Sequence, residues 1–387
     1  MTSLKTETIL CHSGRPDKDF INPPVTRAAT ILFDSVEHMH SVEDHRFDGQ
    51  KLYYGRYGTT STQMLADSLA QLESCDRAIL YPSGVAAISG ALCAITKSGD
   101  HILMTEGVYP NARRFCDEQL SKFNVETSYY DTTIAEDIEK LIRPNTRVIY
   151  MESPASSTME LQNISAILAI AKKHKLITVI DNTWATALRF KPLELGIDLS
   201  IQSATKHISG HSDLVMGVVT GNGDLIDAVG RQAIVMGYCI SADDAYLALR
   251  GLRSMKIRMD HAEKSARIIA RFLKSRAEVI AVLHPEFDVI KATNFKTYFS
   301  GGNGVFSFVI DPKFPAKSVH HFINGMKLFG LGFSWGGFES LIVPQSPNRQ
   351  HNRNPSGSIV RLSIGFEDTD DLIHDLAAGL DRLHEIK

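Results

Sequence analysis

Short apolar runs, separated by polar and small residues, alternate along the chain from about residue 60 onwards. The runs that predict β-strands are Ala78–Tyr81, His101–Met104, Arg147–Met151, Ile177–Ile180, Leu199–Ile201 and Val215–Thr220. Several stretches between them have helical periodicity, and the clearest one places five apolar residues on one face: Leu161, Ile164, Ile167, Leu168 and Ala171. Strands and helices in alternation predict an α/β fold with a mainly parallel sheet and helices on both of its faces.

This alternation ends near residue 243. Residues 243–276 predict a long helix, or two helices in succession, and a smaller α+β unit follows. Its expected strands are Val305–Ile310 and Ile359–Ile364, and its last helix starts near Thr369. Before the alternation begins, the chain looks irregular. We therefore predict an N-terminal arm over residues 1–60, a large domain over 61–250 and a C-terminal α+β domain over 251–387.

The charge of the chain is nearly balanced, with 41 basic and 44 acidic side chains and a net charge of −3. Such a balance creates no field that would gather nucleic acid or an anionic membrane. Five widely spread cysteines without a CxxC pair argue against a disulfide framework and against a zinc site. The N-terminus lacks the apolar core of a signal peptide, and the apolar runs are shorter than the roughly 20 residues that span a bilayer. We expect a cytoplasmic protein without a metal, a nucleic-acid partner or a membrane partner.

Polar side chains directly follow three of the predicted strands. Ser83-Gly84 lies between a strand and a helix of small residues in "AILYPSGVAAISGALCAI", Asp181 ends the strand of "ITVIDNTW", and Lys206 follows the strand of "SIQSATK". Ligands of open parallel sheets bind beyond the carboxyl ends of the strands. These three places should therefore open onto one rim of the sheet.

The first and third places together suit a phosphate group. Free backbone amides at the start of the helix after Ser83 form an anion site, and Gly84 lets the backbone approach a phosphate closely. The hydroxyls of Ser203 and Thr205 can donate hydrogen bonds to the same phosphate. Each of these features is common by itself, so the prediction depends on their combination.

Lys206 and Asp181 extend this pattern to a specific cofactor. Lys206 can be a phosphate-binding point charge or a Schiff-base nucleophile. Asp181 supplies a negative charge in a dry setting, which needs a cationic partner such as a pyridinium nitrogen. This set of residues would bind an aldehyde cofactor that has a phosphate at one end and a pyridine ring in the middle. Pyridoxal phosphate is that molecule.

Eight segments carry a resemblance to a known family: "YYGRYGTTS", "YPSGVAA", "ESPASSTME", "VIDNTWAT", "SIQSATKHISGHSD", "RGLRSM", "FSWGGFESL" and "RLSIGFED". With them the chain resembles, over nearly its whole length, the Cys/Met-metabolism pyridoxal-phosphate enzymes. Within these it is most similar to the bacterial cystathionine β-lyases. The resemblance implies the aspartate-aminotransferase-like fold, with a large cofactor-binding domain and a smaller C-terminal domain.

The resemblance also implies roles for individual residues around the cofactor. Lys206 would form the covalent link to the cofactor, Asp181 would pair with the ring nitrogen, and Tyr109 would lie over the ring face. The phosphate would be held by Gly84, Val85, Ser203 and Thr205, beside the helix cap at Ser83.

Further residues would come from the arm and from the C-terminal domain. Tyr54 and Arg56 would reach the phosphate of a neighbouring subunit, which makes a dimer the smallest active unit and a dimer of dimers the expected assembly. Arg361 would bind the α-carboxylate of the substrate with its two-pronged guanidinium. Ser334 and Trp335 would assist it, and Tyr54 would also contact the substrate.

The implied activity is β-elimination of L-cystathionine to homocysteine, pyruvate and ammonia, a step of methionine biosynthesis by transsulfuration. The alternatives are a γ-lyase, γ-synthase or methionine γ-lyase of the same family and, more remotely, a non-catalytic regulatory protein that binds the cofactor. Two features favour the β-lyase. Ser156-Ser157 stands where γ-type relatives carry Asn-Pro, and Pro110-Asn111 follows Tyr109 where methionine γ-lyases carry Cys.

Two segments near these residues need an interpretation of their own. His207 follows Lys206 where the family often has Tyr, and we interpret it as a histidine that supports the site with its hydrogen bonds satisfied. Residues 346–358, "SPNRQHNRNPSGS", are interpreted as a surface loop that lines the entrance to the site.

Overall fold

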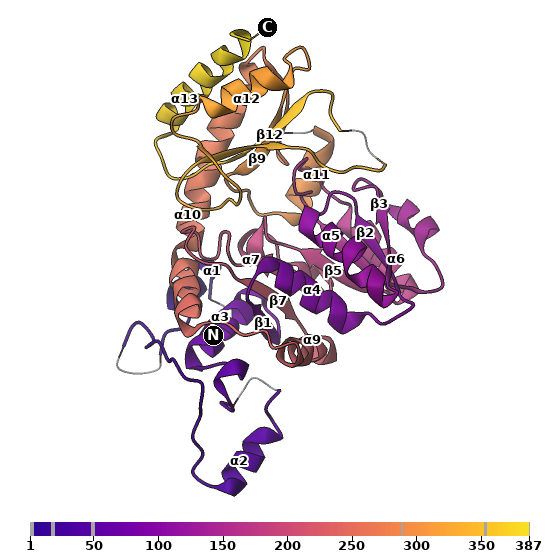
Figure 1. The fold of residues 1–387 in the computed structure, drawn as a ribbon, viewed down its shortest axis with the longest axis vertical. Helices are drawn as coiled ribbons and strands as arrows, with labels where there is room; N and C mark the ends of the chain where they lie inside the picture. The colour runs from indigo at the N-terminus through magenta and orange to yellow at the C-terminus, as the bar shows by residue number, and fades with distance from the viewer. Residues whose placement is uncertain (1–3, 17–19, 48–50, 288, 352–353, 387) are drawn as a thin grey trace.

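The computed structural model describes residues 4–16, 20–47, 51–287, 289–351 and 354–386. An N-terminal arm, a large sheet flanked by helices and a smaller C-terminal sheet follow one another along the chain (Figure 1). Within the described residues, no helix combines the length and the apolar character needed to cross a lipid bilayer.

The large sheet has seven strands in the order β1-β7-β6-β5-β4-β2-β3. Their bounds are β1 (Arg77–Tyr81), β2 (His101–Thr105), β3 (Glu126–Tyr130), β4 (Thr146–Glu152), β5 (Ile177–Asp181), β6 (Leu199–Ser203) and β7 (Gly217–Gly221). Strand β7 is antiparallel to both neighbours, and the remaining pairs are parallel. The prediction of an α/β fold with a mainly parallel sheet is confirmed.

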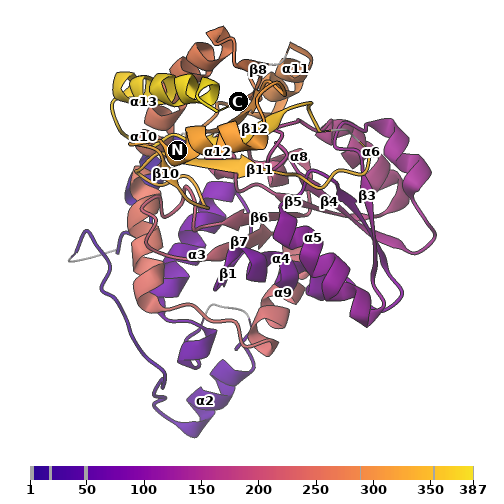
Figure 2. The same cartoon turned by 45° about the horizontal axis from the view of Figure 1, so that its top comes forward.

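Helices cover both faces of this sheet. On one face lie α4 (Gly84–Ile95), α5 (Pro110–Glu118) and α9 (Gly223–Val235), packed against one set of alternating strand residues (Figure 2). The other face is covered by α3 (Thr60–Glu73) and α6 (Ile164–His174). Short elements connect them: η2 (Leu120–Phe123), η3 (Glu136–Leu141), α7 (Thr186–Arg189) and α8 (Pro192–Leu195).

Two predicted element boundaries shift for local reasons. Strand β7 begins at Gly217 rather than at Val215, because the Met216 amide and carbonyl are hydrogen-bonded to Thr205 instead of to a neighbouring strand. Helix α6 begins at Ile164, because the side chain of Asn163 accepts a hydrogen bond from the Ala166 amide and caps the helix there.

A single helix, α10 (Ala242–Ser275), joins the large sheet to the C-terminal part of the chain. Its first half packs with α3 in the core of the large domain, and its second half belongs to the core of the C-terminal sheet. The predicted helix after residue 243 is therefore one element. It runs through the predicted domain boundary near residue 250, and the domain limits stay a prediction.

The C-terminal sheet has five strands in the order β10-β11-β12-β9-β8. The elements are β8 (Val279–Leu283), α11 (Val289–Tyr298), β9 (Val305–Ile310), α12 (Ala316–Asn324), β10 (Gly330–Leu331), β11 (Leu341–Gln345), β12 (Ser358–Ser363), α13 (Thr369–Asp381) and η4 (Arg382–His384). Helix α13 starts where Asp368 accepts hydrogen bonds from the amides of Asp370 and Asp371. This smaller sheet, with its helices, is the predicted α+β unit.

The N-terminal arm contains α1 (Thr6–His12), α2 (Val36–Glu43) and η1 (Gly55–Tyr57). Leu10 of α1 is buried in the core that α3 and α10 share, whereas α2 projects away from both sheets (Figure 1). Several large apolar side chains of the arm are exposed to solvent: Phe20, Ile21, Leu32 and Val36.

Candidate active site

Lys206 lies just beyond the end of β6, where the large sheet meets the C-terminal domain. Its Nζ donates a hydrogen bond to Ser334 Oγ at 2.6 Å and lies 5.4 Å from the centroid of the Trp335 ring. Burial lowers the pKa of Lys206 to about 8, and the positive charge of Arg361 contributes to this shift, while Asp181 opposes it. A larger fraction of this amine than of an ordinary lysine is therefore unprotonated, and nucleophilic, at neutral pH.

Asp181 ends β5, the strand beside β6. It is 8% exposed, and its Oδ1 accepts a hydrogen bond from the Thr183 amide at 3.0 Å. Burial raises its pKa, and the hydrogen bonds from Thr183 and the charge of Lys206 work in the other direction. Within the described part of the chain, no Lys or Arg forms an ion pair with Asp181. A cationic ring nitrogen would supply the missing partner.

The start of α4 closes the same rim of the sheet. Ser83 caps the helix, since its Oγ accepts from the Ala86 amide at 3.0 Å and its carbonyl accepts from the Ala87 amide. The first amides, those of Gly84 and Val85, have no acceptor within the helix. A Cβ on Gly84 would lie 2.9 Å from the side chain of Ser203, so only glycine allows this approach of α4 to β6. The pair of amides suits a phosphate.

The two hydroxyls predicted for the phosphate differ in their hydrogen bonds. Thr205 Oγ1 donates to the Met216 carbonyl at 3.1 Å and accepts from the Met216 amide at 2.9 Å. Its hydrogen is thus engaged, and it would have to leave Met216 in order to donate to a phosphate. Ser203 lies directly beside Gly84, with its backbone amide bonded to Thr183 Oγ1 at 2.8 Å.

Tyr109 forms the N-terminal boundary of α5 and is 37% exposed. Its backbone amide donates to Glu152 Oε2 at 2.7 Å, and its hydroxyl accepts from Asn111 Nδ2 at 2.7 Å. An ionised phenol at Tyr109 would raise the pKa of Arg361, so the two side chains lie within electrostatic range of each other.

Glu152 is a site residue that the sequence reasoning missed. It ends β4, stands directly beside Asp181 in the β4–β5 register, and is buried. Burial and the neighbouring charge of Asp181 raise its pKa well above the ordinary value. The sequence could have indicated this residue, because Glu152 stands at the end of an apolar run in the same way as Asp181 does.

Arg361 and Ser334 bring the C-terminal domain into the site. Arg361 lies on β12, and its Nη2 donates to the Ser334 carbonyl at 3.1 Å. Burial lowers its pKa to about 10, so the guanidinium keeps its charge at neutral pH. Ser334 has a φ of 80°, a conformation that only a surrounding structure can hold in a residue other than glycine.

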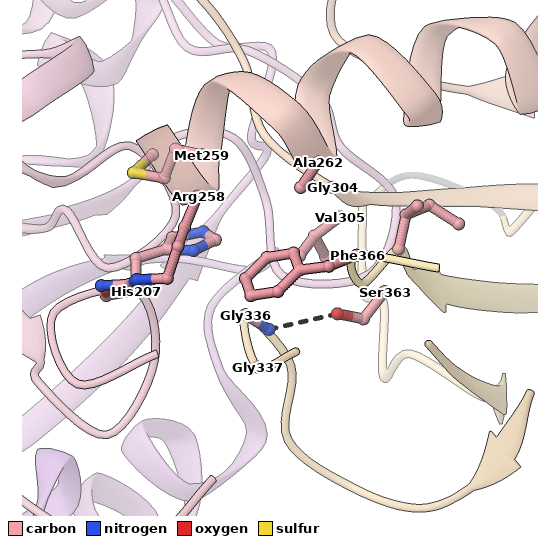
Figure 3. Close-up of a pocket in the computed structure, with 11 residues that line it drawn as sticks. His207, Arg258, Met259, Ala262, Gly304, Val305, Gly336, Gly337, Ser363 and Phe366 are labelled. Carbon is pink, nitrogen blue, oxygen red and sulfur yellow. Dashed lines mark hydrogen bonds between the residues drawn. The ribbon is translucent and has the colours of Figure 1, made fainter. Parts of the chain in front are cut away.

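His207 lies between the Lys206 segment and the C-terminal domain, beside a small cavity (Figure 3). Its ring contacts Trp335, with the ring centroids 5.2 Å apart, and a Cβ on Gly336 would lie 2.9 Å from Nδ1. Burial and nearby cations lower its pKa to about 3, so it is neutral. We expected satisfied hydrogen bonds, but Nε2 has no partner among the described residues.

Arg258 of α10, also missed from the sequence, holds the segment that follows Lys206. Its Nη2 donates to the carbonyls of His207 at 2.8 Å and Gly251 at 2.7 Å. A Cβ on Gly251 would lie 2.3 Å from the Ser209 carbonyl, so glycine lets α10 pack closely on this segment. Gly251 of "RGLRSM" and Arg258 thus connect α10 to the segment "KHISGHSD".

The structure of one chain does not bring Tyr54 and Arg56 to the other site residues. Arg56 Nη1 donates to the carbonyl of Ile234, next to the end of α9, at 2.7 Å, and Tyr54 is 44% exposed. Their contact with a neighbouring subunit stays a prediction.

The chemistry of the donor set fits pyridoxal phosphate. A buried lysine of lowered pKa suits the aldehyde, an unpaired buried carboxylate suits the ring nitrogen, and a glycine-lined helix start suits the phosphate. The neighbouring guanidinium can bind a carboxylate of an amino-acid substrate.

Comparisons with known proteins agree with this arrangement. A family model described as Cys/Met metabolism PLP-dependent enzyme matches residues 7–381. A cystathionine beta-lyase of Haemophilus influenzae is 37% identical over 99% of both chains, and an L-alanine/L-glutamate racemase of Wolbachia pipientis wMel is 37% identical over 98% of both. The crystal structure of metB from Corynebacterium glutamicum superimposes with a TM-score of 0.91 at 29% identity, covering 99% of each chain.

Proposed function

The chain belongs to the Cys/Met metabolism PLP-dependent enzymes, and on this premise we propose that it is a carbon–sulfur lyase acting on L-cystathionine. The reaction is β-elimination with addition of water, which yields homocysteine, pyruvate and ammonia. The observation that carries the proposal is the Lys206 amine, of lowered pKa, beside the Arg361 guanidinium and bonded to Ser334. This arrangement supports the proposal of a base next to a carboxylate-binding group.

Two sequence features and one relative support β-elimination in particular. Ser156-Ser157 and Pro110-Asn111 stand where γ-type relatives carry other residues. The relative from Haemophilus influenzae, named a cystathionine beta-lyase, is similar over the whole chain. The proposed role is a step of methionine biosynthesis by transsulfuration.

When bound, pyridoxal phosphate supplies an electron sink for negative charge at the substrate Cα. Asp181 would hold the ring nitrogen of the bound cofactor in its protonated state, because a cation there would relieve the buried charge of Asp181 itself. Lys206 takes the proton from the substrate Cα. Arg361 binds the α-carboxylate and thereby orients the Cα–H bond toward the base.

The leaving sulfur needs a proton as its bond to Cβ breaks. We propose Lys206, which then carries the proton from Cα, and Tyr109 as its two candidate donors. The hydrogen bond from Asn111 to the Tyr109 hydroxyl fixes the position of this phenol. The remaining three-carbon fragment is hydrolysed to pyruvate and ammonia.

The proposed assembly is a homo-oligomer in which a second copy completes each site. Tyr54 and Arg56 lie on an arm with exposed apolar side chains and do not contact Lys206 in their own chain. We propose that they reach the phosphate site of a neighbouring subunit, with a dimer as the smallest active unit.

Product analysis tests the proposed activity. The purified protein, loaded with pyridoxal phosphate, is incubated with L-cystathionine, and we expect equal amounts of pyruvate and homocysteine. Cysteine with 2-oxobutyrate would instead establish γ-elimination. A protein that binds the cofactor but forms neither pair of products would support a non-catalytic role. The racemase activity of the relative from Wolbachia pipientis wMel is checked separately by measuring D-alanine formed from L-alanine.

A further inference from the structure

A buried ion pair joins the C-terminal domain to the large domain beside the candidate active site. Arg349 lies in the loop between β11 and β12, and its Nε donates to Glu106 Oε1 at 3.0 Å. Its Nη1 donates to Thr158 Oγ1 and to both carboxylate oxygens of Glu160, each at 2.9 Å. The side chains of Arg349 and Glu106 are 3% and 0% exposed. The predicted surface loop thus contains a buried anchor.

The backbone of the same loop adds to this contact. The amides of Gln350 and His351 both donate to Glu106 Oε2 at 2.8 Å, and His351 Nε2 is hydrogen-bonded to the Tyr129 carbonyl at 2.7 Å. Glu106 therefore accepts hydrogen bonds from the Arg349 side chain and from two backbone amides of this loop. Removing the Arg349 guanidinium would take a charged hydrogen-bond donor away from the buried Glu106 carboxylate and from Glu160.

On the large-domain side, this contact ends at the turn that carries Tyr109. Glu106 directly follows β2 and stands three residues before Tyr109. The intervening Gly107 donates from its amide to Thr132 Oγ1 at 3.2 Å and accepts from the Ser156 amide at 2.9 Å. A Cβ on Gly107 would lie 2.6 Å from that of Ala155, so the turn packs closely on the Ala155 segment and has no space for a side chain here.

On the C-terminal side, β12 begins nine residues after Arg349 in the sequence. Strand β12 begins at Ser358 and carries Arg361, whose guanidinium contacts Ser334. The loop is thus the connection between the carboxylate-binding group and the turn of Tyr109.

We propose that Arg349 is a positioning residue that sets the separation between Tyr109 and Arg361 across the two domains. The proposal rests on the proposed function, since it assumes that these two groups act on one substrate. Arg349 itself touches neither substrate nor cofactor. It acts through Glu106 on the Tyr109 turn, and through the loop on β12.

The test compares Arg349→Met with wild type as the loaded enzyme. We expect kcat/KM for L-cystathionine to fall about 10- to 100-fold, because small displacements of positioning groups have effects of this size. Part of the fall must be a rise in KM, since Arg361 moves. Partial unfolding would lower the amount of active enzyme and leave KM unchanged, so an unchanged KM overturns the proposal.

Two further variants sharpen the comparison. Arg349→Lys keeps the charge but loses the two-pronged guanidinium, and it should recover part of the loss. It also replaces Arg349→Met if that variant fails to fold. The matched control is Arg143→Met, which removes a half-exposed ion pair with Glu126 (2.7 Å) inside the large domain. An equal loss in Arg143→Met would contradict a specific role for Arg349.

A double-mutant cycle tests the route through Glu106. Because Arg349 acts through this carboxylate, Arg349→Met combined with Glu106→Gln should lose no more activity than the worse single variant. Losses that multiply would show that the two residues act independently and would overturn the proposal.

Amide hydrogen exchange supplies a readout that needs no turnover. Peptides covering residues 104–112 should exchange faster in Arg349→Met than in wild type, and Arg143→Met should match wild type. If wild type forms no pyruvate but this difference is present, the proposed activity fails while the interdomain contact stands. If exchange in residues 104–112 is unchanged, the role of Arg349 is rejected whatever the activity.

Discussion

Lys206 Nζ lies 2.6 Å from Ser334 Oγ, and this hydrogen bond connects the large domain to the C-terminal domain within the candidate active site. The carbonyl of the same serine accepts a hydrogen bond from Arg361. Ser334 thus holds an amine and a guanidinium side by side. Their repulsion, together with burial, keeps the pKa of Lys206 low.

Replacing this amine should stop the reaction. Lys206→Ala removes the proposed base, and loss of proton transfer alone costs about 10²- to 10⁴-fold in rate. The measurement is pyruvate release from L-cystathionine, with circular dichroism to show that the fold is intact. A variant that retains most of its activity would contradict the proposed role of Lys206.

The reactivity of Lys206 in the cofactor-free protein should depend on pH in a defined direction. Its pKa of about 8 is lower than the ordinary 10.5, so the reactive neutral amine forms as pH rises through 8. Labelling by pyridoxal phosphate with borohydride, followed by peptide mapping, should be half-maximal near pH 8 at Lys206. Arg361→Met removes a positive charge and should move this midpoint to higher pH, whereas Asp181→Asn should move it lower. A midpoint near that of surface lysines would refute the effect of burial.

Asp181→Asn tests the partner of the ring nitrogen. Asparagine keeps an oxygen for the Thr183 amide but loses the charge, and losing one member of a buried charge pair costs about 2–5 kcal/mol. We expect weaker retention of pyridoxal phosphate on dialysis, followed by absorbance, and a lower kcat. Asp198→Asn is the control, because Asp198 binds the Thr178 amide at the opposite end of the same strands. Equal cofactor retention in both variants would argue against the assigned role.

Arg361→Lys tests recognition of the carboxylate. Lysine keeps the positive charge but cannot form two parallel hydrogen bonds, so KM for L-cystathionine should rise about tenfold or more, which is ~1.4 kcal/mol of binding free energy. Steady-state kinetics measure this change. Arg276→Lys, in an ion pair with Glu278 and Asp381 away from the site, should leave KM unchanged. A normal KM in Arg361→Lys would assign the carboxylate to another group.

Much of this fold and site follows from local patterns in the sequence. The strands that lead to Asp181 and Lys206 are short apolar runs, and the side chain after each run must lie at the sheet edge where ligands bind. Strand β3, by contrast, reads "ETSYY" and gives no apolar run, because only its last two residues are buried. Strands of this kind are stabilised by pairing with a neighbour, here β2, and not by their own composition.

Residues that act through distant partners could not be predicted. Arg349 lies among Ser, Pro, Asn and Gln, which indicate an exposed loop, and it is buried only because Glu106 and Glu160 neutralise it. In the sequence, Arg258 is one of several basic residues of a long predicted helix. Only the structure shows that its guanidinium donates to backbone carbonyls. Both depend on contacts between segments far apart in the sequence, which periodicity does not reveal.

The unbroken course of α10 restricts how the two domains can move. A helix of 34 residues is roughly 50 Å long, and this one is embedded at one end beside α3 and at the other beneath the C-terminal sheet. A rotation of one domain away from the other would have to bend α10 near its middle. Arg258 lies there, and its guanidinium is hydrogen-bonded to the backbone that follows Lys206. We therefore expect a substrate to enter through side-chain and loop rearrangements at the rim, while the two domains keep their relative orientation.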